Sequence, residues 1–298
     1  MAKTLSILIL MMLLACGHEE TAKLEAPEHL RLMTFNVLVG TSYESSLKTI
    51  EQSGADIIGM QEASAERLVH LAGQLGYYSA SFSKNPSNAS SNDTGILSKY
   101  PIQEYYEGGV LIKLSEELKV AVFSVHLVPY PYEPYDFRDG KITSASEAIA
   151  SSKTNRLSHM DGVLDQIDQL IGEGVPVFLT GDFNEPSHLD WNNEAADSGK
   201  NFGQVVNWPV SSAIVSVGMV DTYRQSHPDV LGAPGITWTT DESENEVYDR
   251  IDLIYHSPSD GFLLETTSLI GGPGDQAEII VPQYESDHYA VMALFKLK

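Results

Sequence analysis

The chain has 298 residues and a formal net charge of −23 at pH 7, because 41 Asp and Glu residues outnumber 18 Lys and Arg residues. Lys and Arg contacts to phosphate groups supply most non-specific affinity for nucleic acids, so this charge disfavours a duplex DNA enzyme without excluding one. The single cysteine excludes a disulfide within the chain and a metal site built from several thiolates.

The first sixteen residues have the pattern of an export signal. Lys3 provides a positive flank, and the apolar run from Leu5 to Ala15 is too short to span a bilayer comfortably. The run ends in Leu-Leu-Ala-Cys, which resembles the lipobox of bacterial lipoproteins, where cleavage precedes a lipid-bearing cysteine. The alternative is a cleaved soluble signal peptide with an incidental Cys16.

This pattern divides the chain into three parts. We predict a lipoprotein signal peptide at residues 1–16, a polar tether at residues 17–27 and one folded domain at residues 28–298. The protein is then expected to be exported and anchored through lipidated Cys16 to the periplasmic or outer-surface face of a bacterial membrane. We expect the folded domain to be monomeric.

From residue 30 onward, apolar runs of strand length alternate with segments of helical periodicity. In the segment 157–171, apolar residues recur with a period of 3.6, which is typical of an amphipathic helix. This alternation predicts an α/β fold in which helices pack outside the sheets. In chain order, we predict strand 30–37, helix 43–53, strand 55–62, helix 63–75, strand 120–127, helix 157–171 and strands 175–179, 250–255 and 289–297.

Two long connections, 128–152 and 181–208, are predicted to be irregular, and long connections inside a compact domain tend to be functional. The first is rich in tyrosine and follows a candidate catalytic strand. We expect it to overhang the site and to offer apolar and phenolic surface to the leaving group. The alternative is an ordered loop whose aromatic residues pack on the domain. Trp191 and Trp238 are candidates for a further wall.

Polar residues stand at or beside the ends of the predicted strands. The ends of strands in layered α/β folds converge on one mouth, where ligands bind. Carboxylates, amides and imidazoles without thiolates suit Mg²⁺ or Mn²⁺, with Ca²⁺ as a third candidate, and such ions activate phosphoryl groups as Lewis acids. The residues concerned are Asn36, Glu62, His126, Asp182, Asn184, Asp252, Asp287 and His288.

Six short motifs follow one another at domain-scale spacing: Thr-Phe-Asn-Val at 34–37, Gln-Glu at 61–62, Ser-Val-His-Leu at 124–127, Gly-Asp-Phe-Asn at 181–184, Arg-Ile-Asp at 250–252 and Ser-Asp-His at 286–288. In this order they resemble the signatures of the endonuclease/exonuclease/phosphatase superfamily, which includes DNase I-like nucleases, inositol polyphosphate phosphatases and bacterial sphingomyelinases. The resemblance spans residues 30–298. It implies a DNase I-like, four-layer α/β sandwich, with two packed mixed β-sheets flanked by helices.

The resemblance also implies how the acidic and amide residues divide the work of binding. Glu62 would be the principal metal ligand, and Asn36 and Asp287 would complete the metal's surroundings directly or through water. Asp182 and Asn184 would bind the other side of the phosphoryl group, where they would align the attacking water or a second metal.

The histidines take the proton-transfer roles in the same comparison. His288 would be a general base or a donor to the phosphoryl oxygen, held in one tautomer by Asp252. His126 would be the acid for the leaving oxygen or a transition-state donor. Which histidine gives the proton and which takes it stays open. Abasic-site endonucleases place an acid where this chain has Leu38, which puts a second metal in doubt and disfavours DNA repair.

Several of these residues also have structural interpretations. Asn36 is compatible with a turn, Glu62 with a helix cap and His126 with a hydrogen-bonded core position. Asp252 could pair with Arg250. Arg156, at the start of a predicted helix, either points into the site or is solvated.

These observations predict a metal-dependent phosphoesterase that hydrolyses a phosphodiester or phosphomonoester with metal-activated water. A small organic phosphate or a lipid headgroup is favoured over nucleic acid as the substrate. The alternatives are a secreted nuclease of the same fold and a non-catalytic binding protein on this scaffold. The last is disfavoured because none of the site residues is lost.

The lipobox interpretation makes a prediction about Cys16. Expressed in a bacterium with its leader, the wild-type protein should incorporate labelled palmitate and sediment with membranes, and the Cys16→Ala variant should do neither. The several acyl chains of a bacterial lipoprotein should hold firmly, whereas a single chain anchors only marginally. A wild-type protein without label would instead support the soluble signal peptide.

Overall fold

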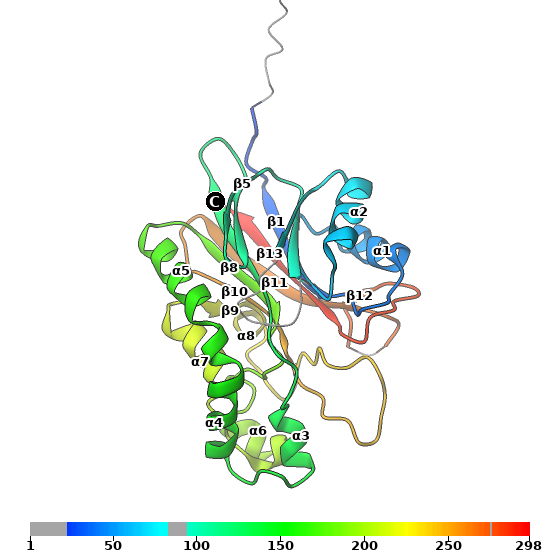
Figure 1. Cartoon of the computed structure of the whole chain (residues 1–298), viewed down its shortest axis with the longest axis vertical. Coiled ribbons are helices and arrows are strands. Elements are labelled where there is room, and N and C mark those ends of the chain that lie inside the picture. Colours follow the sequence, from blue (N-terminus) through cyan, green and yellow to red (C-terminus); the bar gives the residue numbers. More distant parts are fainter. Residues whose placement is uncertain (1–22, 83–93, 275) are drawn as a thin grey trace, which may run out of the picture.

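The computed structural model describes residues 23–82, 94–274 and 276–298. The predictions for residues 1–16, Cys16 included, and for most of the tether lie outside the described residues. Within the described part, two mixed β-sheets of seven and six strands pack face to face and helices lie outside them (Figure 1). No helix in this part of the chain is long and apolar enough to cross a membrane.

The seven-stranded sheet has the order β12-β11-β13-β1-β2-β4-β3. Its central strands β1 and β2 are parallel, with Asn36 opposite Gln61, so Asn36 and the following Glu62 meet at the same edge. The strands are β1 (His29–Asn36), β2 (Ile57–Gln61), β3 (Tyr78–Phe82), β4 (Thr94–Ser98), β11 (Phe262–Gly271), β12 (Ile279–Ile280) and β13 (Ala290–Leu297).

The six-stranded sheet has the order β5-β6-β7-β8-β10-β9. Parallel pairing of β7 with β8 sets His126 opposite Asp182, and antiparallel pairing of β8 with β10 sets Asp182 opposite Asp252. Three candidate site residues are therefore neighbours in one row. The strands are β5 (Ile102–Tyr106), β6 (Gly109–Lys113), β7 (Lys119–His126), β8 (Val177–Asp182), β9 (Val220–Asp221) and β10 (Asp252–His256).

Alternation along the strands separates three apolar layers. On β1, Leu32 packs between the two sheets, whereas Met33 packs outward under α1 (Tyr43–Ser53) and α2 (Ala65–Leu75). On β7, Val122 packs inward and Phe123 outward, under α5 (Asp161–Gly172) and α7 (Pro209–Ser216). Side chains of a strand point alternately to opposite faces, so each central strand serves two layers. The predicted four-layer sandwich is confirmed (Figure 1).

Local signals explain the helix bounds. The side chain of Ser64 accepts the Arg67 N–H, so α2 begins at Ala65, two residues later than predicted, and Ser64 rather than Glu62 caps it. Gly54 takes the left-handed conformation at φ 63°, so α1 ends at Ser53, as the predicted helix 43–53 does. The predicted helix 157–171 divides into the 3₁₀ helix η1 (Leu157–His159) and α5.

The two predicted irregular connections are wrong in part. Residues 128–152 contain α3 (Glu133–Arg138) and the start of α4 (Ala145–Asn155), where the Glu147 side chain accepts the Ser144 N–H at 3.0 Å. Residues 181–208 contain α6 (Asn193–Asp197) and η2 (Asn201–Gly203), and α8 (Thr222–Ser226) follows later. These helices are short or only weakly amphipathic, so apolar periodicity did not indicate them.

The two sheets approach closely at Gly59 in β2, so we predict that a larger residue there destabilises the fold. A Cβ added at Gly59 would collide with Thr180 on the facing sheet and stand 3.2 Å from Ser124 Oγ. We expect Gly59→Ala to destabilise the fold by about 1–3 kcal/mol, the usual cost of overpacking. Urea unfolding measures it, with Gly73→Ala on α2, where a Cβ meets nothing within 4 Å, as the control. Equal stability of both variants would contradict this packing.

Candidate functional site

The interior of the sandwich changes from apolar to polar toward one edge. Along β8, inward-facing positions pass from Phe178 through Thr180 to Asp182, and β7 runs likewise to His126. Polar contacts bridge the sheets at the intermediate level, where the Gln61 amide donates to Ser124 Oγ at 3.0 Å. The period of two that buries the apolar core thus also aims the last residue of each strand into one site.

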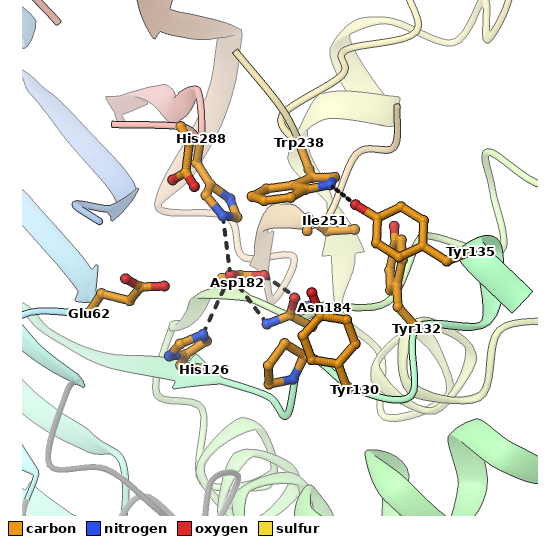
Figure 2. A pocket seen from close by; sticks show the side chains of 12 residues that line it. Glu62, His126, Tyr130, Tyr132, Tyr135, Asp182, Asn184, Trp238, Ile251 and His288 are labelled. Atoms are coloured by element: carbon orange, nitrogen blue, oxygen red, sulfur yellow. Dashed lines mark hydrogen bonds and ion pairs between the residues drawn. The ribbon is translucent and has the colours of Figure 1, made fainter. Parts of the chain in front are cut away.

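A pocket opens at this edge (Figure 2). Six of the eight predicted site residues line it, and the other two, Asn36 and Asp252, are buried directly behind it. Figure 2 shows Asp182 at its centre, between Glu62 on one side and an aromatic group on the other. The lining residues are Glu62, His126, Pro129, Tyr130, Tyr132, Tyr135, Asp182, Asn184, Trp238, Ile251, Asp287 and His288.

Asp182 contacts more of the predicted site residues than any other residue of the pocket. Its Oδ2 accepts from Asn36 Nδ2 at 2.9 Å, across the gap between the sheets, and its Oδ1 accepts the Asn184 N–H at 2.9 Å. His126 Nε2 lies 3.6 Å and His288 Nε2 3.9 Å from Oδ2. The carboxylate is 1% exposed, so these contacts replace water around a charge.

Glu62 is held by an unusual backbone. Glu62 and Leu38 have φ of 57° and 61°, and Asn184 has φ of 46°. Non-glycine residues rarely adopt this left-handed region, and such strain gathers at functional sites. Glu62 Oε2 accepts the Val39 N–H at 2.7 Å, and Oε1 accepts from Asn36 Nδ2 at 3.3 Å. The carboxylate is only partly buried and points into the pocket.

His288 forms a buried pair with Asp252. Its Nδ1 donates to Asp252 Oδ2 at 2.8 Å, and the Trp238 ring lies 4.8 Å from the imidazole, centroid to centroid. Burial alone would lower the pKa of His288, but the charges of Asp252 and Asp182 outweigh it and raise the pKa to about 10. The neighbouring carboxylates therefore favour the protonated imidazole, whose Nε2 faces the pocket.

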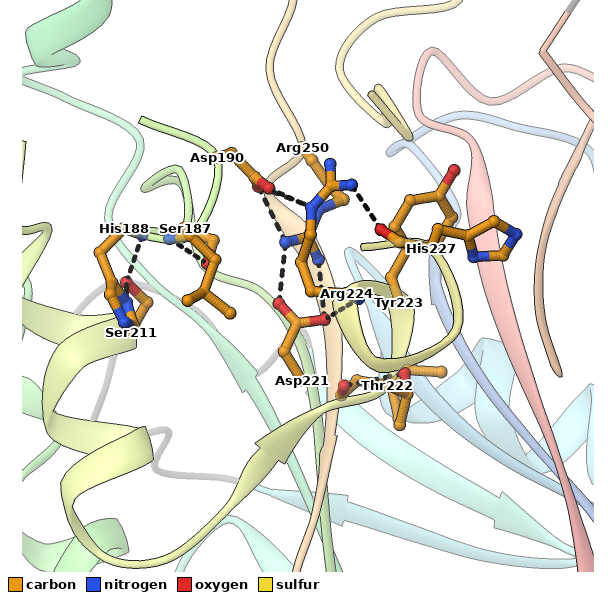
Figure 3. Close-up of polar contacts among 12 residues, drawn as sticks. Ser187, His188, Asp190, Ser211, Asp221, Thr222, Tyr223, Arg224, His227 and Arg250 are labelled. Atoms are coloured by element: carbon orange, nitrogen blue, oxygen red, sulfur yellow. Dashed lines mark hydrogen bonds and ion pairs between the residues drawn. The ribbon is translucent and has the colours of Figure 1, made fainter. Parts of the chain in front are cut away.

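The suggested pairing of Asp252 with Arg250 is wrong. Arg250 donates to Asp221 at 2.8 and 3.1 Å and to Asp190 at 3.0 Å. Figure 3 shows Arg250 and Arg224 together between these two carboxylates. This buried network holds the segment that precedes β10, and leaves Asp252 to the histidine.

The acidic residues fit a divalent cation. Among the described residues, Asp182, Asp252 and His288 bring one ligand atom each within 4.8 Å of one another, so they could hold a metal ion. Asp287 Oδ1 and Asp252 Oδ1 are buried without a hydrogen-bond partner in the described structure. Burial and the nearby Glu62 raise the pKa of Asp287. Carboxylate oxygens are the ligands that hard divalent cations prefer, and a bound cation would stabilise these buried groups.

The amide of Asn36 shows a detail that bears on ligation. Its Oδ1 accepts the Leu38 N–H at 3.1 Å, so Nδ2 faces Glu62 and Asp182. Asn36 is therefore a hydrogen-bond donor in this arrangement. Its predicted role as a metal ligand, which needs the oxygen, stays a prediction. Asn184 Nδ2 donates to the Leu127 carbonyl at 2.9 Å, which anchors this amide beside Asp182.

Both interpretations of Arg156 are wrong. Arg156 is fully buried, ends α4 rather than beginning the long helix, and does not line the pocket. Its guanidinium donates to Glu133 Oε2 at 2.7 Å, to the Val128 carbonyl at 3.2 Å and to the Pro131 carbonyl. Arg156 thus ties down the connection that carries the tyrosines.

The tyrosine-rich connection overhangs the pocket, as expected, through Pro129, Tyr130, Tyr132 and Tyr135. Of the two candidate tryptophans, Trp238 lines the pocket, whereas Trp191 packs in a separate apolar cluster. Ile251, the middle residue of the Arg-Ile-Asp motif, also lines the pocket, although the sequence predicted no role for it.

Comparison with known proteins places the chain among sequences of one family. A sequence model of the Endonuclease/Exonuclease/phosphatase family matches residues 33–288. Uncharacterized protein F14F9.5 of Caenorhabditis elegans is 28% identical over 290 residues, which cover 89% of this chain and 90% of that protein.

Solved structures show the same fold at low identity. The endonuclease/exonuclease/phosphatase from Beutenbergia cavernae DSM 12333 has a TM-score of 0.55 at 17% identity, covering 91% of this chain and 72% of that one. TDP2 from D. rerio, complexed with a single strand DNA product, has a TM-score of 0.54 at 14% identity, covering 91% and 100%. These likenesses concern the fold alone.

The acidic site predicts metal binding that depends on Glu62. We expect Mg²⁺ or Mn²⁺ to raise the thermal midpoint of the protein, because a ligand that binds only the folded state stabilises it. Glu62→Gln should weaken the affinity at least about 10–100-fold, the loss typical of disturbing even residues behind metal ligands. Isothermal titration calorimetry measures it, with Glu66→Gln on the exposed start of α2 as the control. Unchanged affinity would remove Glu62 from the metal site.

Proposed function

Because the chain belongs to the endonuclease/exonuclease/phosphatase family, we propose that it is a divalent-metal-dependent phosphoesterase that hydrolyses a phosphodiester or phosphomonoester with water. The observation that carries the proposal is the convergence of Asp182, Asp252 and His288 from two strands and the last loop at one pocket. The unpartnered oxygen of Asp287 and the partly buried Glu62 add the ligands that a cation needs.

The His288–Asp252 pair acts on the phosphoryl oxygens of the substrate. His288 in its protonated form donates from Nε2 to a phosphoryl oxygen, and Asp252 fixes the ring through Nδ1. This assigns donation, rather than base catalysis, to His288. Charge that develops on the phosphoryl oxygens then meets a preorganised positive group in a site with little water.

Asp182 and His126 act on the attacking water and on the leaving oxygen, respectively. Asn36 and Asn184 hold the Asp182 carboxylate in one orientation, where it aligns the attacking water and accepts its proton. His126, 3.6 Å from Asp182, protonates the leaving oxygen. Glu62 and Asp287, with Asp182, would hold the cation, which when bound supplies Lewis-acid charge to the phosphoryl group.

We propose a small organic phosphate or a lipid headgroup as the substrate. The twelve described residues that line the pocket include no Lys or Arg, and the net charge is −23. The phosphates of a polynucleotide would be repelled by the net charge of the protein and would find no cationic Lys or Arg among these lining residues. A secreted nuclease is the second candidate, supported by the likeness in fold to TDP2 from D. rerio complexed with single strand DNA product.

The cellular place rests on the leader sequence. We propose export and lipid anchoring through Cys16 to a bacterial membrane, supported by the Leu-Leu-Ala-Cys tetrapeptide that ends at residue 16. An active site that is tethered near a membrane would meet lipid headgroups at high local concentration.

The proposed activity is tested with a chain that lacks residues 1–16, a change that removes none of the described residues. Bis-p-nitrophenyl phosphate, p-nitrophenyl phosphate, sphingomyelin and plasmid DNA are compared, each with and without EDTA. We expect turnover of at least one small or lipid ester and its loss on chelation. Faster cleavage of plasmid DNA than of any ester would favour the nuclease, and full activity after exhaustive demetallation would contradict the mechanism.

The His288–Asp252 pair predicts coupled kinetic effects. His288→Ala should lower kcat by roughly 10²- to 10⁴-fold, the usual contribution of a positioned acid or base. Asp252→Asn should lower kcat as well, because it leaves the imidazole in the wrong tautomer. The double variant should lose far less than the product of both effects, since residues that act as one unit are not additive.

These measurements need a folded reference, so the thermal midpoint of each variant is measured first. His70→Ala, which removes an exposed histidine on α2, is the matched control and should keep wild-type kcat. If both single variants fold and keep near-wild-type kcat, the pair is structural and the proposed mechanism fails.

A further inference from the structure

The pocket is divided into two chemically different halves. One half consists of the carboxylates, amide and imidazoles described above. The other, which we call the aromatic wall, lies on the opposite side of Asp182 (Figure 2). The two halves touch where the Trp238 and His288 rings lie 4.8 Å apart. The aromatic wall consists of Pro129, Tyr130, Tyr132, Tyr135, Trp238 and Ile251.

Most polar atoms of the aromatic wall are already engaged by the protein. Trp238 Nε1 donates to the Tyr135 hydroxyl at 3.0 Å, and that hydroxyl is also hydrogen-bonded to Glu246. The Tyr132 hydroxyl donates to Asp249 Oδ2 at 2.8 Å. These three rings therefore offer carbon surface, rather than donors or acceptors, to whatever enters the pocket.

The aromatic wall is held in place by Asp249. This carboxylate is 5% exposed and also accepts from Trp191 Nε1 at 3.0 Å, so it fixes Tyr132 against the body of the domain. The main chain of Asp249 exchanges two hydrogen bonds of 3.0 Å with Trp238. Side chain and main chain of one residue thus fix two rings, and Trp238 fixes Tyr135 in turn. A surface that is preorganised in this way loses little entropy on binding.

We infer that the aromatic wall is the specificity surface of this site and binds an uncharged, apolar group carried by the phosphorus, best an aromatic ring. The inference rests on the proposed phosphoesterase function and narrows its substrate class. A phosphoryl group that contacts His288 would place its substituent against Trp238, because the two rings are adjacent. The substituent then exchanges water for ring carbon, which is the favourable transfer for apolar surface.

The composition of the aromatic wall distinguishes this occupant from charged ones. Pro129 and Ile251 add aliphatic surface, which stabilises an apolar group but leaves a cation without compensation for its lost water. The nearby carboxylates Asp249 and Glu246 lie behind the tyrosine hydroxyl groups that they bind. A second phosphate would find no Lys or Arg among the described lining residues. Polyphosphate substrates are therefore disfavoured.

The test compares three non-hydrolysable phosphonates with the intact protein in Mn²⁺ by isothermal titration calorimetry. Methylphosphonate reports the phosphoryl site alone, phenylphosphonate adds a ring, and 2-(trimethylammonio)ethylphosphonate adds a cation. We expect phenylphosphonate to bind about tenfold more tightly than methylphosphonate, a difference of ~1.4 kcal/mol. The cationic probe should gain no more than about twofold.

Three variants locate the effect. Trp238→Leu should reduce the phenyl-to-methyl affinity ratio to about twofold. Tyr135→Phe, which keeps the ring but loses the hydroxyl that binds the indole and Glu246, should reduce it to an intermediate value. Tyr105→Leu on β5, which removes an aromatic ring that is 65% exposed, is the control and should keep the full ratio. Tyr135→Phe changes one hydroxyl, so it keeps the test decisive if Trp238→Leu does not fold.

Each contrary outcome has one meaning. Equal binding of methylphosphonate and phenylphosphonate by the wild-type protein would overturn the inference alone, because methylphosphonate would still report a working phosphoryl site. Tightest binding of the cationic probe would assign the aromatic wall to a cation instead. A ratio unchanged in both Trp238→Leu and Tyr135→Phe would place the ring elsewhere. No binding of any phosphonate would count against the proposed phosphoesterase itself.

Discussion

The hydrogen bond from Asn36 to Asp182 is the contact on which the site depends, because it joins the two sheets at the edge where their interior becomes polar. Each sheet alone would end in an isolated polar side chain, which is costly to bury. Packed together, the sheets satisfy Asp182 with two amide groups and leave its remaining side to His126 and His288. The packing of the two sheets therefore also builds the site, because the distance between the sheets sets the distance between the groups that take part in the reaction.

Negative charge is concentrated at this junction, and the described residues of the pocket counter it with histidines alone. Burial raises the pKa of Asp287, and the charges of Asp252 and Asp182 raise the pKa of His288. Oxygens of Asp252 and Asp287 nevertheless stay without partners in the described structure. A fold that tolerates such unsatisfied groups is less stable than it would be without them, a cost that is ordinary at functional sites. A bound cation would relieve it, which is why metal binding and stability should rise together.

Outside the polar junction, buried ion pairs hold loops in place. Arg156 pairs with Glu133 inside the connection that follows β7, and Arg250 joins Asp190 and Asp221 in front of β10. Loops normally lie on the surface and move more than the elements that they join. Buried guanidinium groups that bind several acceptors at once restrict that freedom. The aromatic wall can be rigid because its connection ends in such an anchor and because Asp249 fixes it from behind.

The sequence by itself indicated the strands β1, β2, β7 and β8, the helices α1, α2 and α5, and the polar residues at the ends of those strands. A buried strand requires an apolar run, and the polar residue that ends it must lie at the sheet edge. It did not indicate edge strands such as β5, whose residues 103–105 are exposed and lack an apolar run. It also missed α3, which has only six residues, and α4, which begins at a capping box and is only weakly amphipathic. Only the tertiary structure decided which partner each polar group takes: Arg156 finds Glu133, the Asn36 amide turns its nitrogen inward, and Trp238 rather than Trp191 reaches the pocket. Those choices depend on contacts between segments distant in the chain, which local pattern does not encode.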